Sequence, residues 1–357
     1  GLTKAGAGTL TLSGANTYTG ATNISAGTLT LGNNERIADS SAVIVASGAT
    51  LNLGNYGETF GSLAGAGTVT KSGTTARTLA VGGDNTSTTF SGVIQQTGTG
   101  ALSLTKNGNG TLALSGANTY TGVTTINAGT LVAANNTALG TLAGGTTVAN
   151  GATLALQGGI TVGAEALSIN GTGVGGDGAL RNLGGNNTLG GTVTLAGNAE
   201  IQSDGGTLTL NAANSVTGAT RNLTIDGVGN TTINGTITTT SGTLTKNGTG
   251  TLTLSGNNTY TGATAVNAGT VAVTANNALG TTANGTTVAS GATLDFRSVA
   301  YTTTEAVTLN GGTLSTSVGT SSFVGGVTLN APSSISVGGT QLTLSGTVSA
   351  PSSTLTD

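Results

Sequence analysis

Short segments along the chain alternate between polar and apolar residues with a period of two. Residues 9–12 read TLTL, residues 28–31 read TLTL again, and residues 251–254 repeat the same letters. Successive side chains of a β-strand point to opposite faces, so the pattern predicts strands with leucine on one face and threonine on the other. Glycine and asparagine, which favour turns, separate these segments, and we find no helical periodicity of useful length. The sequence therefore predicts an all-β protein.

A long stretch of the chain occurs three times. Residues 4–32 read KAGAGTLTLSGANTYTGATNISAGTLTLG, and close copies occupy residues 106–134 and 246–274. In each copy Lys-x-Gly-x-Gly precedes a Thr/Leu alternation, then Ser-Gly-x-Asn-Thr-Tyr-Thr-Gly, and later Ala-Gly-Thr. Internal repeats of this kind indicate stacked structural units, none of which buries its apolar side alone.

The spacing within a copy predicts how its strands stack. Thr9 and Thr28 are 19 residues apart, and the equivalent threonines of the other two copies have the same spacing. Equal spacing is expected when a coil returns on itself after about 19–25 residues. Leucines then stack in the interior, while the threonines between them face water. The leucines expected to point inward are Leu10, Leu12, Leu29, Leu31, Leu112, Leu114, Leu131, Leu252 and Leu254.

The three copies resemble a known family, the autotransporter-associated β-strand repeat, also called the passenger-associated transport repeat. In the first copy the resemblance is carried by Gly6, Gly8, Thr9, Leu10, Leu12, Ser13, Gly14, Asn16, Thr17, Tyr18, Gly20, Gly27, Thr28 and Leu29. The strong match covers about a quarter of the chain. The resemblance implies a right-handed parallel β-helix, secretion through the outer membrane and a place on the bacterial cell surface. It implies no single activity, because such passengers include adhesins, self-associating proteins and scaffolds that carry an enzyme domain.

We therefore expect residues 1–357 to form one continuous right-handed parallel β-helix, a β-solenoid of about 15–18 coils. Its repeat units begin near Lys4, Lys106 and Lys246. Looser alternation continues between the copies without a linker or a break in composition. The chain begins inside a repeat, so we expect it to be a fragment of a longer protein whose leader and outer-membrane anchor lie outside it.

Composition excludes several classes of protein. The 357 residues include 64 glycines but only 9 Lys and Arg and 12 Asp and Glu, with a net charge of −3. Abundant alternating apolar residues and low charge argue against disorder, and glycine without a three-residue period argues against collagen. The absence of a basic patch argues against a nucleic-acid partner. There is no cysteine for disulfides, and no apolar run is long enough to span a bilayer.

The chain offers few residues for catalysis or metal binding. It contains no histidine, which excludes Ser-His-Asp and Cys-His mechanisms and a His-rich metal site. The weak candidates for a cation site or a glycosidase-type acid cluster are Asp177, Asp204 and Asp226, if successive coils stacked them on one face. Each is followed by glycine, and Asp-Gly is a turn signal, so we interpret them as turn residues. We expect no catalytic residue, no metal and no cofactor.

Other recurrent polar residues have a structural interpretation. We interpret Lys4, Lys106 and Lys246 as solvated turn residues. Aromatic packing over the turn is favoured over a sugar-stacking platform for the tyrosines, and backbone hydrogen bonding at corners is expected of the asparagines. The residues that define the repeat are Leu10, Leu12, Asn16, Tyr18, Leu29, Leu112, Leu114, Asn118, Tyr120, Leu131, Leu252, Leu254, Asn258 and Tyr260.

By elimination and by resemblance, the sequence predicts a structural and adhesive protein rather than an enzyme. We expect a stalk or fibre segment, extracellular or on the bacterial cell surface, that takes part in cell–cell or cell–matrix contact. Few charges and long Thr/Asn/Ser rows favour self-association, end to end or side by side. Surface glycans or matrix are further possible partners. The alternative is a carbohydrate-active β-helix enzyme, a polysaccharide lyase or glycosidase, that uses the three aspartates.

Overall fold

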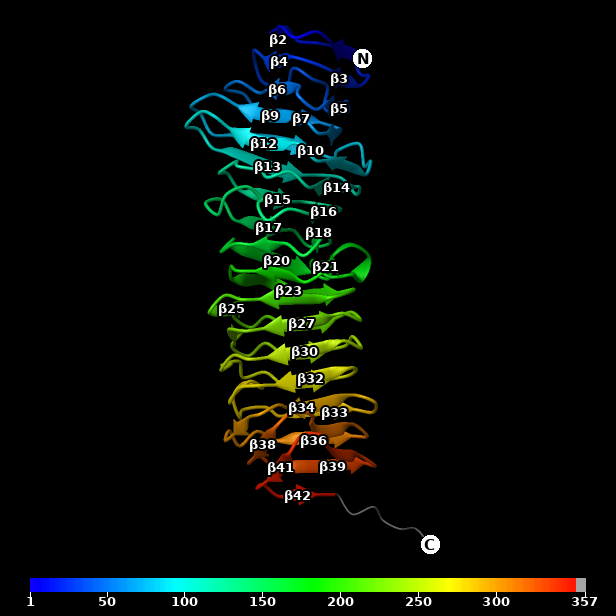
Figure 1. Ribbon diagram of the computed structural model, residues 1–357, viewed down its shortest axis with the longest axis vertical. Helices are drawn as coiled ribbons and strands as arrows, with labels where there is room; N and C mark the ends of the chain where they lie inside the picture. The colour runs from blue at the N-terminus through cyan, green and yellow to red at the C-terminus, as the bar shows by residue number, and fades with distance from the viewer. Residues whose placement is uncertain (351–357) are drawn as a thin grey trace. The chain divides into compact units, whose positions relative to one another are not determined.

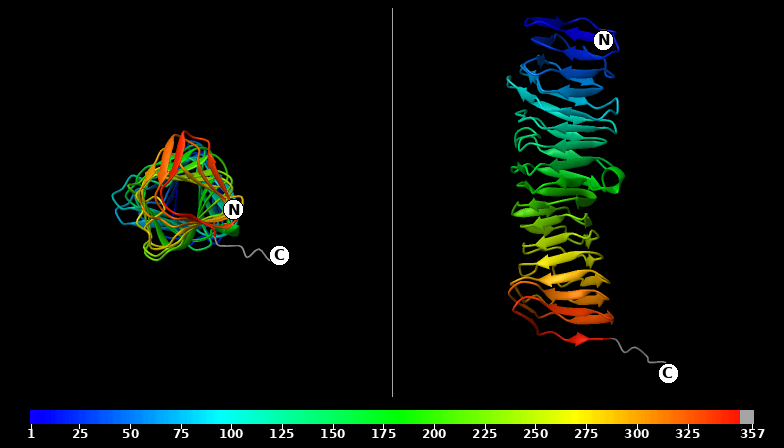
Figure 2. Two further views of the ribbon diagram at one scale, coloured as in Figure 1. Left: turned by 90° about the horizontal axis from the view of Figure 1, so that it is seen from below. Right: turned by 45° about the vertical axis from the view of Figure 1, so that its right-hand side comes forward.

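The computed structural model describes residues 1–350 of the chain, which divide into two compact units at Leu183 and Gly184. Each unit is a parallel β-solenoid, and together they hold about 17 turns (Figure 1). Within each unit the turns follow a closed path with strands on its sides and loops at its corners (Figure 2). The only helical element among the described residues is a 3₁₀ turn, η1, at Val174–Gly176. The all-β parallel solenoid predicted from the sequence is confirmed.

The strands of unit 1 stack in three parallel ladders. The first ladder runs through β2 (Thr9–Leu12), β4 (Thr28–Leu31), β6 (Thr50–Asn52), β9 (Thr68–Lys71) and β12 (Val93–Gln96). The second runs through β1 (Leu2–Lys4), β3 (Thr22–Ile24), β5 (Ala42–Val45), β8 (Ser62–Gly65), β11 (Thr88–Phe90), β14 (Thr111–Leu114), β16 (Thr130–Ala133) and β18 (Thr153–Gln157). The third runs through β7 (Glu58–Phe60), β10 (Arg77–Val81), β13 (Leu102–Lys106), β15 (Thr124–Ile126), β17 (Thr146–Val148) and β20 (Leu167–Gly171). The short β19 (Thr161–Val162) lies at a corner, and β21 (Leu180–Gly184) falls at the boundary between the units.

Unit 2 stacks its strands in the same parallel way. One ladder runs through β22 (Asn187–Leu189), β24 (Thr207–Leu210), β27 (Asn230–Ile233), β30 (Thr251–Leu254), β32 (Thr270–Val273), β34 (Thr293–Phe296), β37 (Thr313–Thr316) and β40 (Ser334–Val337). A second runs through β23 (Val193–Ser203), β26 (Leu223–Asp226), β29 (Leu244–Lys246), β31 (Thr264–Val266), β33 (Thr286–Ala289), β36 (Val307–Asn310), β39 (Val327–Ala331) and β42 (Val348–Ser349). Two shorter ladders are β25 (Asn214–Thr217) with β28 (Thr236–Thr238), and β35 (Ala300–Tyr301) with β38 (Thr320–Phe323) and β41 (Gln341–Leu344).

The register within each copy is the one that the 19-residue spacing predicts. Thr9 pairs with Thr28 and Leu10 with Leu29 in parallel alignment, and the first strands of the other two copies pair with the same offset. Because a slip of one residue would turn every leucine outward, this register fixes which face becomes the core.

Leucine, or another apolar residue at the equivalent strand position, forms the interior columns of the solenoid. Leu29 and Leu131 have no exposed surface, and Leu112 is 2% exposed. Leu31, Leu114, Leu252 and Leu254 are buried as well. Leu10 and Leu12 are only half-buried, since β2 is the edge strand of its ladder and has a neighbour on one side alone.

The first two copies of the repeat do not occupy the same face of unit 1. The first strand of copy one, β2, belongs to the first ladder, whereas its counterpart in copy two, β14, stacks on β11 in the second ladder. The irregular turns between the copies, whose lengths differ, move the repeat from one face to another. Equivalent residues of these copies therefore do not form a straight row.

The Ala-Gly-Thr segment depends on glycine for two reasons. Gly129 has φ +64°, a left-handed conformation that glycine adopts readily. A Cβ at this position would lie 2.4 Å from the carbonyl oxygen of Gly110, one turn earlier. Glycine thus allows the two turns to approach closely enough for their strands to pair.

Candidate functional site

The recurrent lysines are buried, so the prediction that they are solvated turn residues is wrong. The exposed fraction is 6% for Lys4, 0% for Lys106 and 2% for Lys246. Lys71, which the sequence analysis did not single out, is fully buried too. These four are all the lysines that the chain contains.

Each ammonium is satisfied by backbone carbonyl oxygens. The Nζ of Lys106 donates to the carbonyls of Asn107 at 2.6 Å, Gly108 at 2.8 Å and Ala128 at 3.2 Å. Lys4 makes the same three bonds one copy earlier, at 3.1, 2.7 and 3.0 Å. Gly108 has φ +64°, and this tight turn directs two carbonyls toward the ammonium. We call this arrangement the lysine clamp: it joins a glycine turn to the following turn of the solenoid.

Lys71 and Lys246 form reduced versions of the clamp. The Nζ of Lys71 donates to the carbonyls of Gly73 at 2.8 Å and Gly100 at 3.1 Å, and that of Lys246 donates to the carbonyl of Gly248. Burial lowers the pKa of Lys106 and of Lys246 to about 8. The negative charge of a nearby aspartate raises each pKa, but by less than burial lowers it. Because the ammonium groups are enclosed, the lysines have a structural role and form no ligand-binding row.

In the second and third copies the tyrosine and asparagine of the turn also point inward. Tyr120 and Tyr260 have no exposed surface, and the hydroxyl of each lies 2.7 Å from a threonine hydroxyl four residues later. Tyr18 is half-buried and makes the same contact with Thr22 at 2.9 Å. The enclosed rings of Tyr120 and Tyr260 present no face on which a sugar could stack.

Asn118 connects three successive turns. Its Oδ1 accepts from the backbone N–H of Ile94 at 2.8 Å, and its Nδ2 donates to the carbonyl of Ala138 at 2.7 Å. Asn258 makes the corresponding bonds to Ile237 and Ala278. Asn16 is exposed and bonds only the carbonyl of Arg36. As the sequence analysis expected, these asparagines bond backbone groups at corners.

The three candidate aspartates lie in turns or at strand ends. Asp177 forms an ion pair with Arg181 at 2.7 Å, and the glycine after it has φ +94°. Asp204 accepts a hydrogen bond from Gln202 at 2.6 Å, and Asp226 accepts one from the N–H of Gly227, which has φ +97°. Within residues 1–350 no group of three or more acidic residues is arranged to hold a metal ion.

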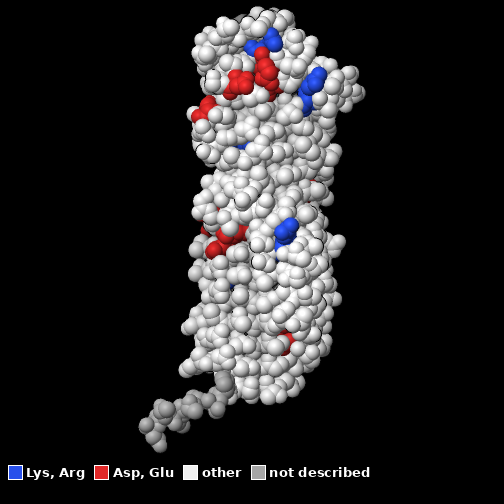
Figure 3. Space-filling view, turned by 180° about the vertical axis from the view of Figure 1, so that it is seen from behind, with Lys and Arg blue, Asp and Glu red and all other residues white. Residues whose placement is uncertain are grey.

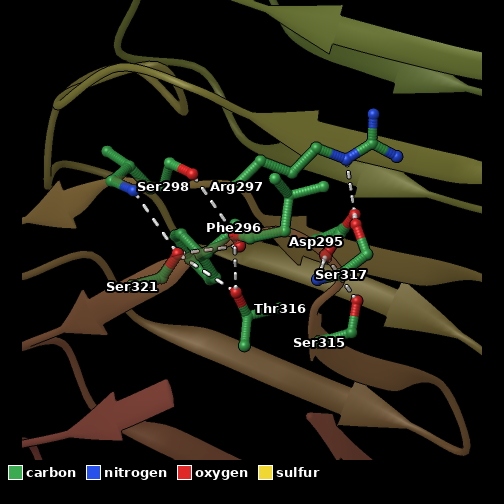
Figure 4. Close-up of polar contacts among 10 residues, drawn as sticks. Asp295, Phe296, Arg297, Ser298, Ser315, Thr316, Ser317 and Ser321 are labelled. Carbon is green, nitrogen blue, oxygen red and sulfur yellow. Dashed lines mark hydrogen bonds and ion pairs between the residues drawn. The ribbon is translucent and has the colours of Figure 1, made fainter. Parts of the chain in front are cut away.

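Asp295 is a buried carboxylate that the sequence analysis missed (Figure 4). It is 2% exposed and accepts hydrogen bonds from Ser315 Oγ at 2.8 Å, Ser317 N at 2.8 Å, Ser317 Oγ at 2.5 Å and Arg297 Nε at 2.6 Å. Burial alone would raise the pKa of this carboxyl, but its hydrogen bonds to Ser317, Arg297 and Ser315 together lower it below the usual value. Both carboxylate oxygens accept hydrogen bonds, and these bonds join two neighbouring turns.

Two buried glutamates occupy equivalent corners of the two units. Glu165 accepts from the hydroxyl of Thr146 at 2.9 Å, and Glu305 accepts from that of Thr286 at 3.0 Å. Burial raises the pKa of both carboxyls, to about 7 for Glu305. The sequence contains a signal for this pair, since each glutamate follows the lysine of its copy, Lys106 or Lys246, by 59 residues.

A cavity of about 400 Å³ opens beside Glu165 in unit 1. Its walls come from three consecutive corners of the solenoid, residues 118–119, 136–142 and 161–165. Leu139, Leu142 and Val162 supply apolar surface, and Leu142 is 54% exposed. Sequence reasoning gave no indication of this cavity.

Comparison with known proteins agrees with the pattern of the repeats. The family model described as Passenger-associated-transport-repeat matches residues 2–31, 104–133, 201–221 and 244–273. The chain carries passenger-associated transport repeats. The curated relative "Adhesin BmaC autotransporter" of Brucella suis biovar 1 (strain 1330) is 38% identical over 135 residues, which cover 36% of this chain and 4% of the relative. No solved structure matches the chain.

One passenger-associated transport repeat escaped the sequence analysis. Residues 201–221 contain Gly205-Gly206 followed by the Thr/Leu alternation of β24. Asp204 replaces the first glycine of the Lys-x-Gly-x-Gly motif, and the lysine of that motif is absent. Without the lysine and the Asn-Thr-Tyr-Thr-Gly turn, only the TLTL letters remained as a signal. The repeat thus has a part that forms strands and a separate part, Lys and Tyr, that joins turns.

The outer surface carries little charge. Figure 3 shows one face on which acidic and basic side chains form a few small groups on an otherwise uncharged surface. Exposed large apolar residues include Val123 at 49% in unit 1 and Val228 at 71% in unit 2. In the part of the chain that the structure describes, no element is a helix of the length and hydrophobicity that a membrane crossing requires.

Proposed function

We propose that this chain is a structural and adhesive segment of an autotransporter-type passenger, displayed on the bacterial surface or secreted. The observation that carries the proposal is that the segments that match the passenger-associated transport repeat form turns of the solenoid, in which the lysines and most of the leucines are buried. The matched relative is named an adhesin, which supports the adhesive part of the proposal. We propose no enzymatic activity, because the aspartates that an enzyme would need are engaged in turns and pairs.

The adhesive surface that we propose consists of the outward threonine rows. Thr105, Thr125 and Thr147 are aligned on successive strands of unit 1 and face outward while their neighbours are buried. Hydroxyl groups at a regular spacing can exchange hydrogen bonds with glycans, matrix proteins or an identical surface. Each contact is weak, and repetition along the solenoid raises the total affinity.

Adhesion is tested with fluorescent beads that carry the purified chain, attached through a terminal tag, on cultured cells and on matrix proteins. Beads that carry the chain denatured before attachment provide the matched control. We expect retention of the folded chain well above that of the control. Equal retention of both would contradict an adhesive role.

Self-association is tested separately by sedimentation velocity from low to high micromolar concentration at physiological salt, with electron microscopy of the concentrated sample. We expect the mean sedimentation coefficient to rise with concentration and rods or bundles to form. A monodisperse monomer throughout would refute self-association and leave adhesion to other molecules as the proposed role.

A further inference from the structure

The two corners that hold the buried glutamates differ in the access that they give to the carboxyl group. Glu165 and Glu305 each accept one side-chain hydrogen bond through Oε1, from the hydroxyl of Thr146 or of Thr286. Within residues 1–350 the second carboxyl oxygen, Oε2, has no hydrogen-bond partner in either unit. What surrounds this free oxygen therefore decides what each glutamate can do.

The free oxygen is enclosed in unit 2 and accessible in unit 1. Glu305 has no exposed surface, and its Oε2 is sealed inside the corner. Glu165 is 3% exposed and lines the cavity of unit 1, and its Oε2, unlike that of Glu305, is not enclosed. A carboxyl group that is almost wholly buried thus presents one unpaired oxygen to an open space.

The segment before each glutamate accounts for this difference. Thr161 and Thr302 occupy equivalent positions, because the N–H of each donates to an asparagine Oδ1 of the preceding turn at 2.8 Å. In unit 2 the next residue is Thr303, whose hydroxyl donates to two asparagine side chains and holds the segment against that turn. In unit 1 the next residue is Val162, which has no hydroxyl, and the segment from it to Glu165 is one residue longer.

The lining of the cavity combines apolar walls with a single ionisable group. Leu139, Leu142 and Val162 supply the apolar surface, and no other lining residue than Glu165 is ionisable. Burial raises the pKa of the Glu165 carboxyl, because its charged form loses water and gains only one side-chain hydrogen bond in return. A bound cation would stabilise that charged form. A calcium ion requires about six to eight oxygen ligands, so one carboxylate does not suit it.

We propose that this cavity binds an aliphatic ammonium group. The ammonium donates a hydrogen bond to Oε2 of Glu165, and its methylene chain packs against Leu142 and Val162. The volume of about 400 Å³ is within the range of small-molecule sites. A free alkylamine and the lysine side chain of another protein share this chemistry. All four lysines of this chain are buried, so a second copy of it does not supply the group.

The test titrates the whole chain with n-butylammonium chloride and with N-acetyl-lysine N-methylamide, and follows the backbone amide NMR signals of Leu142 and Gly163. The control ligand is 1-butanol, which has the same alkyl chain without the charge. We expect butylammonium to bind about tenfold more tightly than 1-butanol, because only the ammonium forms a charge-assisted hydrogen bond with the carboxylate. Tighter binding of the lysine derivative than of butylammonium would identify a polypeptide side chain as the source, and the reverse order would identify a free amine.

Three variants locate the binding site. Glu165→Gln keeps an oxygen that accepts from Thr146 but removes the charge, so it should weaken butylammonium binding about tenfold and leave 1-butanol binding unchanged. Glu305→Gln makes the same change at the sealed corner and should affect neither ligand. Leu142→Thr introduces the residue that unit 2 has at this position, Thr282, at an exposed site where folding is not at risk, and should weaken the binding of both ligands. Failure of butylammonium to bind the wild-type chain, or equal binding to wild type and Glu165→Gln, would overturn the proposal.

Discussion

The ammonium of Lys106 donates a hydrogen bond to the carbonyl oxygen of Ala128, which is 22 residues later and one turn further along the solenoid, at 3.2 Å. The same ammonium holds the two carbonyls of its own glycine turn. A single charged side chain thus closes a turn and joins it to the next. This arrangement explains why lysine precedes Gly-x-Gly in the repeat although its charge is removed from water.

Replacing Lys106 by methionine tests the lysine clamp. Three hydrogen bonds from a charged donor are worth about 1.5–3 kcal/mol each, whereas a pKa lowered from 10.5 to about 8 corresponds to a penalty of about 3 kcal/mol. The bonds outweigh the penalty, so we expect Lys106→Met to lower the free energy of unfolding by about 2 kcal/mol or more. Urea denaturation at pH 7 measures this, and a variant as stable as wild type would show that the clamp contributes nothing.

The asparagine bridge between turns is tested by a pair of variants in the same copy. Asn118→Ala leaves the N–H of Ile94 and the carbonyl of Ala138 without partners in the interior, which should cost about 2–4 kcal/mol. Asn127 makes its side-chain bond to Asn107 at the surface, so Asn127→Ala should cost less than about 0.5 kcal/mol. Thermal unfolding of both variants measures the difference, and similar losses would contradict the assigned roles.

The direction of the side chains in β14 is tested by two neighbouring residues. Leu112 is 2% exposed, and Leu112→Ala should cost about 2–5 kcal/mol because it leaves a cavity in the core. Thr111 lies on the opposite face, half-exposed, and Thr111→Ala should cost less than about 1 kcal/mol. Equal shifts of the urea midpoint for the two variants would mean that the register is incorrect.

The register could be predicted from the sequence because it depends on local alternation and on one repeated spacing. The burial of Lys106 could not, because its third acceptor, Ala128, belongs to the next turn and is chosen only when the turns stack. A charged residue beside glycine is ordinarily a surface residue, and the sequence contains no sign of the carbonyls that surround it here. For the same reason the change of face between copies one and two depends on irregular turn lengths that carry no periodic signal.

The cavity was beyond sequence reasoning for a different reason. Its walls come from three separate corner segments of the sequence, residues 118–119, 136–142 and 161–165, which meet only when the turns stack. Glu165 and Glu305, by contrast, recur at a fixed distance from the lysine of each copy and could have been found by extending the repeat alignment.

Glu305 should make the stability of the chain depend on pH. Burial raises its pKa from 4.5 to about 7, so the folded state holds a proton that the unfolded state has already lost between these pH values. Stability from this group is therefore complete below pH 4.5 and falls as the pH rises through 7, by up to about 3 kcal/mol. Glu305→Gln should remove this part of the pH dependence and be the more stable form at pH 8. Urea denaturation at pH 5 and pH 8 measures the slope, and an unchanged slope in the variant would contradict the assignment.

The lysines of the passenger-associated transport repeats lie inside the solenoid and leave its surface to other residues. Labelling with an amine-reactive succinimidyl ester at neutral pH, followed by peptide mass spectrometry, tests this directly. We predict that Lys71, Lys106 and Lys246 remain unlabelled in the folded chain, and that all four lysines are labelled once urea unfolds it. Labelling of Lys106 in the folded chain at the rate found in urea would contradict the account.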